Sequence, residues 1–287
     1  MTFDNGTLKP AISLWLTNEN EALQTYGHIS NWDVSNVTNM GEMFRDAVTF
    51  NQDISNWDVS NVINMRWMFY NAYDFNQDIS NWDVSNVTNM ECIFYGSAFN
   101  KDISIWDVSN VTNMTSMFDG NCVFNKNISN WDVSNVTEMH AMFYNARVFD
   151  QDISGWDTTN VTIMSYMFHG ACVFNQDISK WDISNVADMN NMFHGACVFN
   201  QDISNWDVSN VTDMNDMLTD TLIAGIFYPR DFATKFHIPY PSPGHAQEMK
   251  IRSKVALASS TNITKYPNSS LFTIPNELVR NIGTFVN

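Results

Sequence analysis

A Trp-Asp pair recurs along this chain at an almost constant interval. The steps between successive pairs are 25 residues, except for one step of 24, and the tryptophans are Trp32, Trp57, Trp82, Trp106, Trp131, Trp156, Trp181 and Trp206. A constant period of this length is typical of stacked repeat arrays. A copy of 25 residues cannot bury its own apolar side chains, so the copies are expected to stack on one another.

Positions within a copy are counted from its isoleucine, so that Ile54 is position 1 and Asp78 is position 25 of the second copy. Apolar residues occupy positions 1, 4, 6, 9, 12, 15, 16, 19 and 22. Trp57 and Val59 flank an aspartate, and this alternation predicts a short strand. Positions 12, 15, 16 and 19 have the i, i+3, i+4, i+7 spacing of one helix face, which predicts a short helix. Asparagine at position 8 or threonine at position 10 would cap that helix, and glycine or asparagine at position 18 would end it.

The fold class expected from this pattern is α/β. We expect a right-handed, leucine-rich-repeat-like solenoid with one short parallel strand and one short helix per 25-residue coil, and about eight coils. The Ile-x-x-Trp-x-Val-x-x-Val spacing matches the L-x-x-L-x-L pattern of leucine-rich repeats, with valine in place of the usual asparagine.

The repeat also resembles a known family. The segment FNQDISNWDVSNVTNM, followed by MF and alanine, is similar to the BspA-like leucine-rich-repeat surface proteins, a family of unknown function first noted in mycoplasma lipoproteins. The lead-in EALQTYGHISNWDVSNVTNM resembles members from large DNA viruses and marine microbes. The resemblance implies a one-sheet solenoid used for binding, without catalytic residues. It also implies a viral or protist source, and host cytoplasm or virion as the location of a viral protein.

Five segments are expected along the chain. They are a helical N-terminal cap (1–27), the repeat solenoid (28–220), a C-terminal cap (221–238), a linker (239–270) and a short C-terminal helix (271–287). In the first cap, Leu8, Ile12, Trp15 and Leu16 are expected to form one apolar stripe. The last segment, LFTIPNELVRNIGTFVN, resembles the opening of an F-box, a helical module that docks onto a ubiquitin-ligase adaptor.

The chain is acidic, with 31 Asp and Glu against 14 Lys and Arg and a net charge of −17. This balance argues against a nucleic-acid partner or an anionic membrane surface, which need clustered basic residues. No stretch of 18 apolar residues and no secretory signal is apparent, so we expect no membrane insertion and an intracellular location. Reduced thiols fit that location, although Cys172 and Cys197 lie one coil apart and a disulfide between them stays open.

Aspartate occupies position 5 of every copy and position 25 of most. Stacked carboxylates repel one another, so something must offset the repulsion. One alternative is local hydrogen bonding to the backbone, as in an Asx-turn. The other is cation binding along the ladder formed by Asp33, Asp58, Asp83, Asp107, Asp132, Asp157, Asp182 and Asp207. We favour the first and expect no metal and no cofactor.

Positions 13, 14 and 17 vary freely between copies, unlike the nearly uniform positions 5 and 7. Exposed aromatic residues at such positions can anchor a specific protein partner. The candidate partner-binding residues are Trp67, Tyr70, Tyr95, Tyr144 and Tyr166. His140, His169 and His194 fall on the same face and are interpreted as solvated surface residues, because no Ser-His-Asp order or paired catalytic carboxylate accompanies them.

The sequence therefore predicts a non-enzymatic repeat protein that acts as a protein–protein interaction or structural scaffold, with its partner unidentified. Two alternatives remain open. One is a substrate-recognition adaptor of a ubiquitin ligase, with the F-box-like C-terminus as the docking segment. The other is a structural rod stabilised by cations bound to the aspartate ladder.

Overall fold

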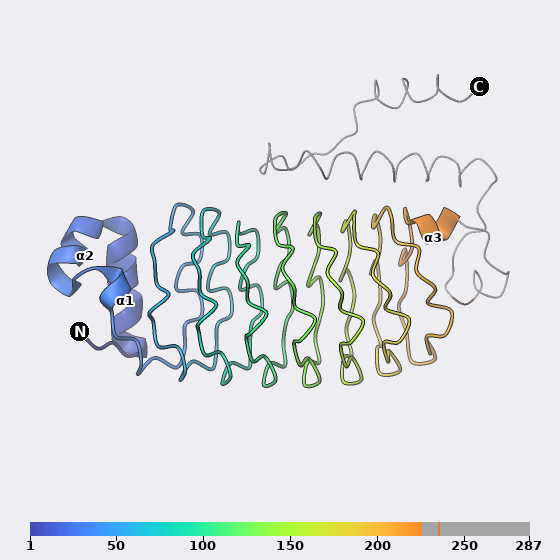
Figure 1. The fold of residues 1–287 in the computed structure, drawn as a ribbon, viewed down its shortest axis with the longest axis horizontal. Coiled ribbons are helices and arrows are strands. Elements are labelled where there is room, and N and C mark those ends of the chain that lie inside the picture. The colour runs from blue at the N-terminus through green and yellow to red at the C-terminus, as the bar shows by residue number, and fades with distance from the viewer. Residues whose placement is uncertain (226–234, 236–287) are drawn as a thin grey trace, which may run out of the picture.

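The computed structural model describes residues 1–225 and residue 235. Two helices, α1 (Asn5–Thr17) and α2 (Glu19–Tyr26), begin the chain, followed by a short 3-10 helix, η1 (Ile29–Asn31). The repeat copies then lie side by side as coils of one elongated stack, and α3 (Leu222–Gly225) follows the last coil (Figure 1). The predicted linker, the C-terminal helix with its F-box-like sequence, and most of the predicted C-terminal cap lie outside the described residues.

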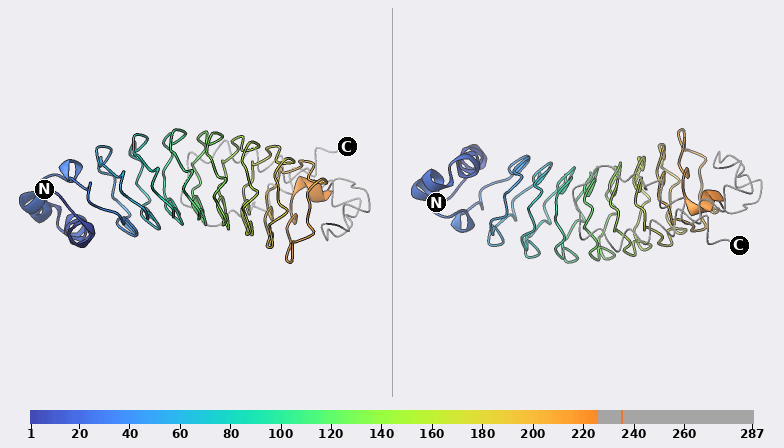
Figure 2. Two further views of the ribbon diagram at one scale, coloured as in Figure 1. Left: turned by 90° about the horizontal axis from the view of Figure 1, so that it is seen from below. Right: turned by 90° about the horizontal axis from the view of Figure 1, so that it is seen from above.

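Neighbouring coils are joined by backbone hydrogen bonds in one repeating pattern. The N–H groups at positions 12, 14, 16 and 18 donate to the carbonyl groups at positions 11, 13, 15 and 17 of the next coil. In the second coil, Met65 donates to Asn89 at 3.0 Å and Trp67 donates to Glu91 at 2.8 Å. The coils therefore stack in register, and two further views show the elongated form that results (Figure 2).

The predicted helix in each coil is wrong. No helix is assigned between residues 32 and 221 of the described chain. Positions 14 and 18 have positive φ in every coil, from 51° at Ser116 to 73° at Gly195, which ends any right-handed helix. The segment is a series of turns closed by i to i+3 bonds, such as Met68 N to Met65 O at 3.1 Å. Helix formation would use N–H groups internally that here bind the next coil.

The predicted strand also differs from the structure. Trp57 and Val59 are buried as expected, but no strand is assigned to them. Parallel pairing occurs instead as one isolated bridge per coil at position 11, for example between Asn64 and Asn89. The leucine-rich-repeat class and the handedness of the stack stay predictions.

The core contains the nine apolar positions named from the sequence. In the second coil, all nine side chains are at most 3% exposed, as at Trp57. Phenylalanines at position 16 of neighbouring coils stack with ring centroids 5.5–5.9 Å apart. Each also stacks on position 22 of its own coil at 3.8–4.1 Å. Two continuous columns of rings thus run through most of the array and bury the surface that no single coil can cover.

The N-terminal helices cover the first coil. Asp4 caps α1 by accepting hydrogen bonds from the N–H groups of Gly6 and Thr7, and Gly27 ends α2 with a φ of 77°. Trp15 packs edge-on against Trp32, the position 4 tryptophan of the first coil, with centroids 5.8 Å apart. Leu8, Ile12 and Trp15 are buried, but Leu16 is 41% exposed, so its place in the predicted apolar stripe is wrong.

Candidate functional site

The polar residues that repeat in nearly every copy are used inside the stack. The indole N–H at position 4 donates to the position 1 carbonyl of the preceding coil at 3.0–3.2 Å, seven times along the array. The side-chain amide of asparagine at position 8 donates to the position 7 carbonyl of the preceding coil at 2.7–2.9 Å. These residues therefore hold neighbouring coils together. The expectation that asparagine at position 8 caps a helix is wrong.

Both aspartate columns accept hydrogen bonds from nearby serine or threonine residues. At position 5, a carboxylate oxygen accepts from the N–H group at position 7 at 2.9–3.1 Å. At position 25, the aspartate, or Asn127 in the fourth copy, accepts the corresponding bond from the N–H group at position 2 of the next copy at 2.9–3.0 Å. The local bonding predicted as one alternative is present. Bonds from Ser184 and Ser179 hold the pKa values of Asp182 and Asp177 below their usual range.

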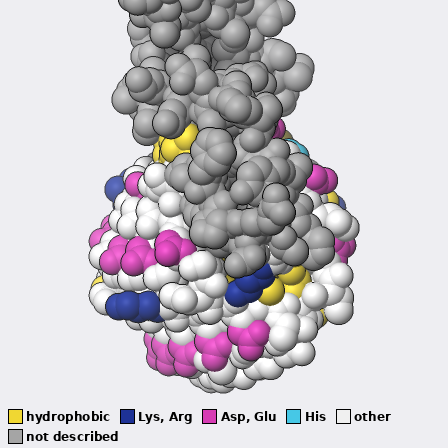
Figure 3. Space-filling view, turned by 90° about the vertical axis from the view of Figure 1, so that its right-hand side faces the viewer, with side chains coloured by type: hydrophobic (Ala, Val, Ile, Leu, Met, Phe, Trp, Pro, Cys, Tyr) yellow, Lys and Arg dark blue, Asp and Glu magenta, His cyan; other side chains and the backbone are white. Residues whose placement is uncertain are grey.

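Acidic side chains line up in short rows on the surface seen from the end of the stack (Figure 3). Within the described residues, no group of three or more His, Cys, Asp or Glu residues is arranged to hold a metal ion. Neighbouring aspartates do repel: Asp157 and Asp207 both raise the pKa of Asp182, but less than the hydrogen bonds from Ser184 lower it. At Asp182, hydrogen bonding within the coil thus offsets the repulsion from the neighbouring coils.

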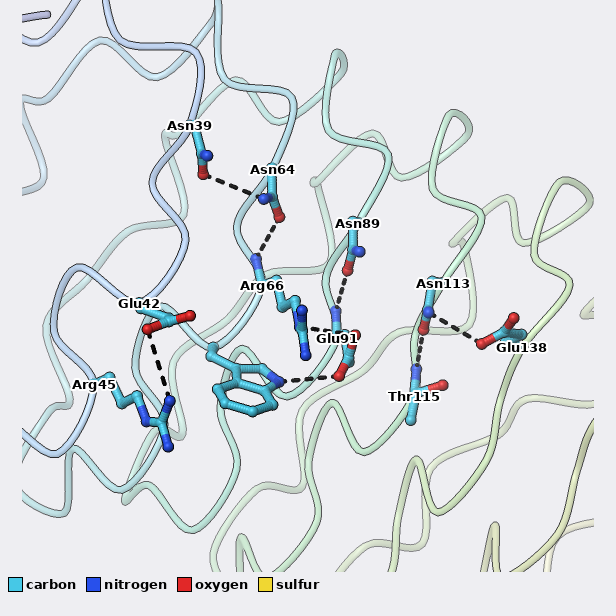
Figure 4. A network of polar contacts seen from close by, with 11 residues as sticks. Asn39, Glu42, Arg45, Asn64, Arg66, Asn89, Glu91, Asn113, Thr115 and Glu138 are labelled. Carbon is cyan, nitrogen blue, oxygen red and sulfur yellow. Dashed lines mark hydrogen bonds and ion pairs between the residues drawn. The ribbon is translucent and has the colours of Figure 1, made fainter. Parts of the chain in front are cut away.

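The variable positions 13, 14 and 17 gather on another face of the stack. At its N-terminal part, Trp67 lies between two arginines, because the guanidinium carbons of Arg45 and Arg66 are each 4.4 Å from its ring centroid. The Trp67 indole N–H donates to Glu91 at 3.0 Å, and Glu91 also pairs with Arg66 at 3.0 Å. Glu42, Arg45, Arg66 and Glu91 are gathered beside the column of position 11 side chains (Figure 4). Trp67 is thus already engaged by its own chain.

Position 17 forms a column of its own along this face. Tyr70 and Tyr95 stack with centroids 4.4 Å apart. Further along, Tyr144 stacks on His169 at 4.6 Å, and His169 stacks on His194 at 4.8 Å. The candidate partner-binding residues therefore fall into two groups, with Trp67, Tyr70 and Tyr95 in one and Tyr144 and Tyr166 in the other. All five are half-buried.

The two histidines of this column are not the solvated residues that the sequence suggested. The Nδ1 atoms of His169 and His194 are buried and have no hydrogen-bond partner in the described structure. Burial, with a smaller effect of His194, lowers the pKa of His169 to about 4, so its imidazole is neutral near pH 7. Tyr144 and His169 are therefore two neutral rings in contact within this column.

Asp119 separates the two groups of rings. It occupies position 17 of the fourth coil and lies between Tyr95 and Tyr144 in the column order. Its carboxyl group accepts one hydrogen bond, from the Ser116 hydroxyl at 3.2 Å. Burial raises the pKa of Asp119 to about 7, and this effect outweighs the opposing hydrogen bond. Asp119 differs in this respect from Asp177 and Asp182 of the repeating columns, whose pKa values are lowered, and the repeat pattern gives no sign of this difference.

Two more pairs of side chains on this side of the molecule carry groups that can act as nucleophiles or bases. His140 Nδ1 lies 2.9 Å from Ser165 Oγ, but Ser165 is only 3% exposed and none of the described carboxylates is hydrogen-bonded to His140. A buried hydroxyl without an acid-oriented imidazole is a poor nucleophile. Cys172 and Cys197 are not joined by a disulfide in the structure, and a hydrogen bond from Cys197 lowers the pKa of Cys172 to about 7. The backbones of the two coils are hydrogen-bonded beside these cysteines, since the Gly170 N–H donates to the His194 carbonyl at 2.8 Å.

Among the described residues, no helix is long and apolar enough to cross a membrane. Comparison with curated proteins and with solved structures finds no match. A family model described as "Mycoplasma protein of unknown function, DUF285" matches residues 15–98, 79–169 and 117–223. These matches overlap one another and together cover residues 15–223, well over half of the chain. The array of stacked 25-residue copies therefore belongs to the DUF285 family of mycoplasma-type repeat proteins of unknown function.

Proposed function

We propose that this protein is a non-enzymatic interaction scaffold that binds a protein partner through the face formed by positions 13, 14 and 17. One observation supports the proposal most directly. The polar residues that repeat from copy to copy are committed to bonds within the stack, whereas the variable positions carry half-buried aromatic rings in two stacked groups. Rings already held in place lose little conformational freedom on binding, which favours their use as anchors.

The BspA-like, leucine-rich-repeat identity is part of the same proposal. It is supported by the period of the repeat and by the single parallel bridge at the same position of successive coils. A rigid stack in which each coil contacts only its neighbours presents one long surface, and such surfaces suit binding to extended partners.

Affinity capture with matched variants tests the proposal. The protein with Tyr95→Ala and Tyr144→Ala loses two rings of the variable face, and we expect it to capture its partner at least about tenfold less well than the unmodified protein. The control carries Asn56→Ala and Asn81→Ala, two exposed residues on the repeated face, and should bind normally. Circular dichroism checks that both variants are folded. Equal capture by all three proteins, with the same partner identified by mass spectrometry, would show that this face is not the contact.

A further inference from the structure

We propose that Tyr95, Asp119 and Tyr144 form a binding site for a guanidinium group, in which an arginine side chain of a partner protein inserts between the two rings and pairs with the carboxylate. This inference rests on the proposed interaction function and names the chemistry that the surface recognises. It concerns one place in the column of position 17 side chains, where Asp119 interrupts the row of aromatic rings.

The backbone places the three residues next to one another. Gly96 N–H donates to the Asp119 carbonyl at 2.7 Å, and Gly120 N–H donates to the Tyr144 carbonyl at 2.7 Å, so position 17 of three successive coils is held in register. Where both neighbours in this column carry rings, the rings stack at 4.4–4.8 Å. Tyr95 and Tyr144 are two coils apart, and no ring contact joins them in the described structure. The shorter Asp119 side chain leaves the column one planar group short.

The carboxyl group of Asp119 lacks a cation. Its one hydrogen bond comes from Ser116, and no ion pair to it is found among the described residues. The pKa of Asp119, raised to about 7 by burial, reflects a carboxylate that has lost water without gaining a positive partner. An incoming cation would restore the lost stabilisation, and in a partly desolvated site the attraction is stronger than in water.

The same column already holds a guanidinium against aromatic rings and carboxylates. Arg45 occupies position 17 of the first coil, and its guanidinium carbon lies 5.5 Å from the ring centroid of Tyr70, the next member of the column. It also lies 4.4 Å from the Trp67 ring. Its nitrogens reach Glu42 at 3.7 Å and Asp46 at 3.5 Å. A guanidinium on aromatic faces beside carboxylates is therefore compatible with the spacing of these coils.

Arginine fits this site better than the other candidates. A guanidinium is planar and permanently charged, so it can stack on two ring faces and pair with a carboxylate at once. A lysine ammonium satisfies the charge but offers no flat surface, and an aromatic ring offers a flat surface but no charge. The repeat region, residues 28–220, carries 25 acidic and 6 basic residues, which favours approach of a basic partner.

Titration of the full chain with N-acetyl-arginine amide tests the inference at pH 8, where Asp119 is ionised. Tyrosine fluorescence or tyrosine ring resonances report binding, and for so small a ligand we expect a dissociation constant on the order of 1–10 mM. N-acetyl-lysine amide should bind at least about fivefold more weakly. The Asp119→Asn variant keeps the shape of the side chain and should lose at least about tenfold in affinity. The control Asp74→Asn removes one charge from an exposed aspartate and should bind as the unmodified protein does.

Equal affinity of Asp119→Asn and the unmodified protein, or equal affinity for the arginine and lysine amides, overturns the inference. The proposed interaction function still stands after either result if the variant with Tyr95→Ala and Tyr144→Ala loses partner capture. Failure of the guanidinium site and failure of the interaction function can therefore be told apart. Light scattering during the titration adds a second readout. If the arginine amide converts a dimer of this chain into monomers, the natural occupant is a second copy and the assignment to a partner protein is wrong.

Discussion

Two faces of the same stack follow different rules. At positions 4, 5, 7 and 8, almost every coil carries the same residue, and these residues are tied by hydrogen bonds to their own or the preceding coil. At positions 13, 14 and 17 the residue changes from coil to coil, and contacts are made between side chains whose identity varies. Repetition within this chain therefore marks bonds that build the stack, while variation marks a surface that the stack does not need.

The difference should appear most clearly in the free energy of unfolding. Trp131→Phe removes the indole N–H that donates to the Ile103 carbonyl at 3.1 Å in a buried position. The unpaired carbonyl and the lost ring volume should together cost about 2–4 kcal/mol. Tyr144→Phe is a change of similar type on the variable face and should cost less than about 0.5 kcal/mol. Urea unfolding followed by circular dichroism measures both, and similar losses would remove the distinction between the faces.

The second prediction concerns pH, because the two faces contain aspartates of opposite behaviour. Among the repeated aspartates, Asp177 and Asp182 have lowered pKa values in the folded protein, so they contribute stability above the pKa of the unfolded chain and lose it as the pH falls. Asp119 has a pKa raised to about 7, so the folded state binds its proton more tightly and stability declines as the pH rises from about 4 through 7.

The Asp119→Asn variant isolates this effect. The variant should lack the decline in stability with rising pH. Its free energy of unfolding relative to the unmodified protein should therefore rise by about 1–3 kcal/mol between pH 4 and pH 8. The range lies below the full free energy of the pKa shift, because Asp119 is only half-buried. The measurement is the difference between two urea-unfolding series across this pH range. A difference that does not change with pH would mean that Asp119 is as solvated as the repeated aspartates.

A smaller effect is expected from the asparagines that join neighbouring coils. Asn135→Ala removes the side-chain amide that donates to the Ser109 carbonyl at 2.7 Å, and should destabilise the protein by about 1 kcal/mol. Thr115→Ala changes position 13 of the neighbouring coil and should stay within about 0.5 kcal/mol. Thermal unfolding of the two single variants tests this contrast, which fails if Thr115→Ala is the more damaging substitution.

The smallest predicted effect has the opposite sign. Glu42 is exposed at position 14 with a φ of 64°, a conformation that costs little only for glycine. Glu42→Gly should therefore stabilise the protein by about 0.5–1 kcal/mol. Glu42→Ala loses the same weak pair with Arg45 but keeps the unfavourable φ, so it controls for the ion pair. Equal stability of the two variants in urea unfolding would show that position 14 carries no backbone strain.

Much of the core could be predicted from the sequence, because burial follows from periodic apolar residues alone. Met65, Met68 and Phe69 were placed inside correctly even though the assigned helix was wrong. A series of turns with i to i+3 bonds directs nearly the same positions inward as a helix does, so the apolar period cannot separate the two. The glycine or asparagine at position 18 of six copies carries a signal of positive φ, although the sequence alone suggests a helix end there.

The backbone conformation at position 14 and the surroundings of Asp119 could not be predicted, because no single copy of the sequence carries a signal for them. Position 14 holds residues as different as Trp67, Cys92 and Ala141, all with positive φ and none of them glycine. That conformation is imposed by the bonds to the next coil, which no single copy reveals. Asp119 had no signal for a similar reason: its electrostatic partners are in other copies, since burial and the nearby Asp119 raise the pKa values of Tyr95 and Tyr144, which belong to the copies on either side.

The direction of the bonds between coils has a consequence for how such a chain can change in length. The N–H groups at positions 12, 14, 16 and 18 donate toward the C-terminal neighbour, while positions 4, 8 and 10 donate toward the N-terminal one. Every coil thus offers the same two unlike surfaces, and any coil can follow any other. Duplication or loss of a whole copy in the gene preserves each bond. Recombination of the gene can therefore change the number of coils without any other change in the sequence.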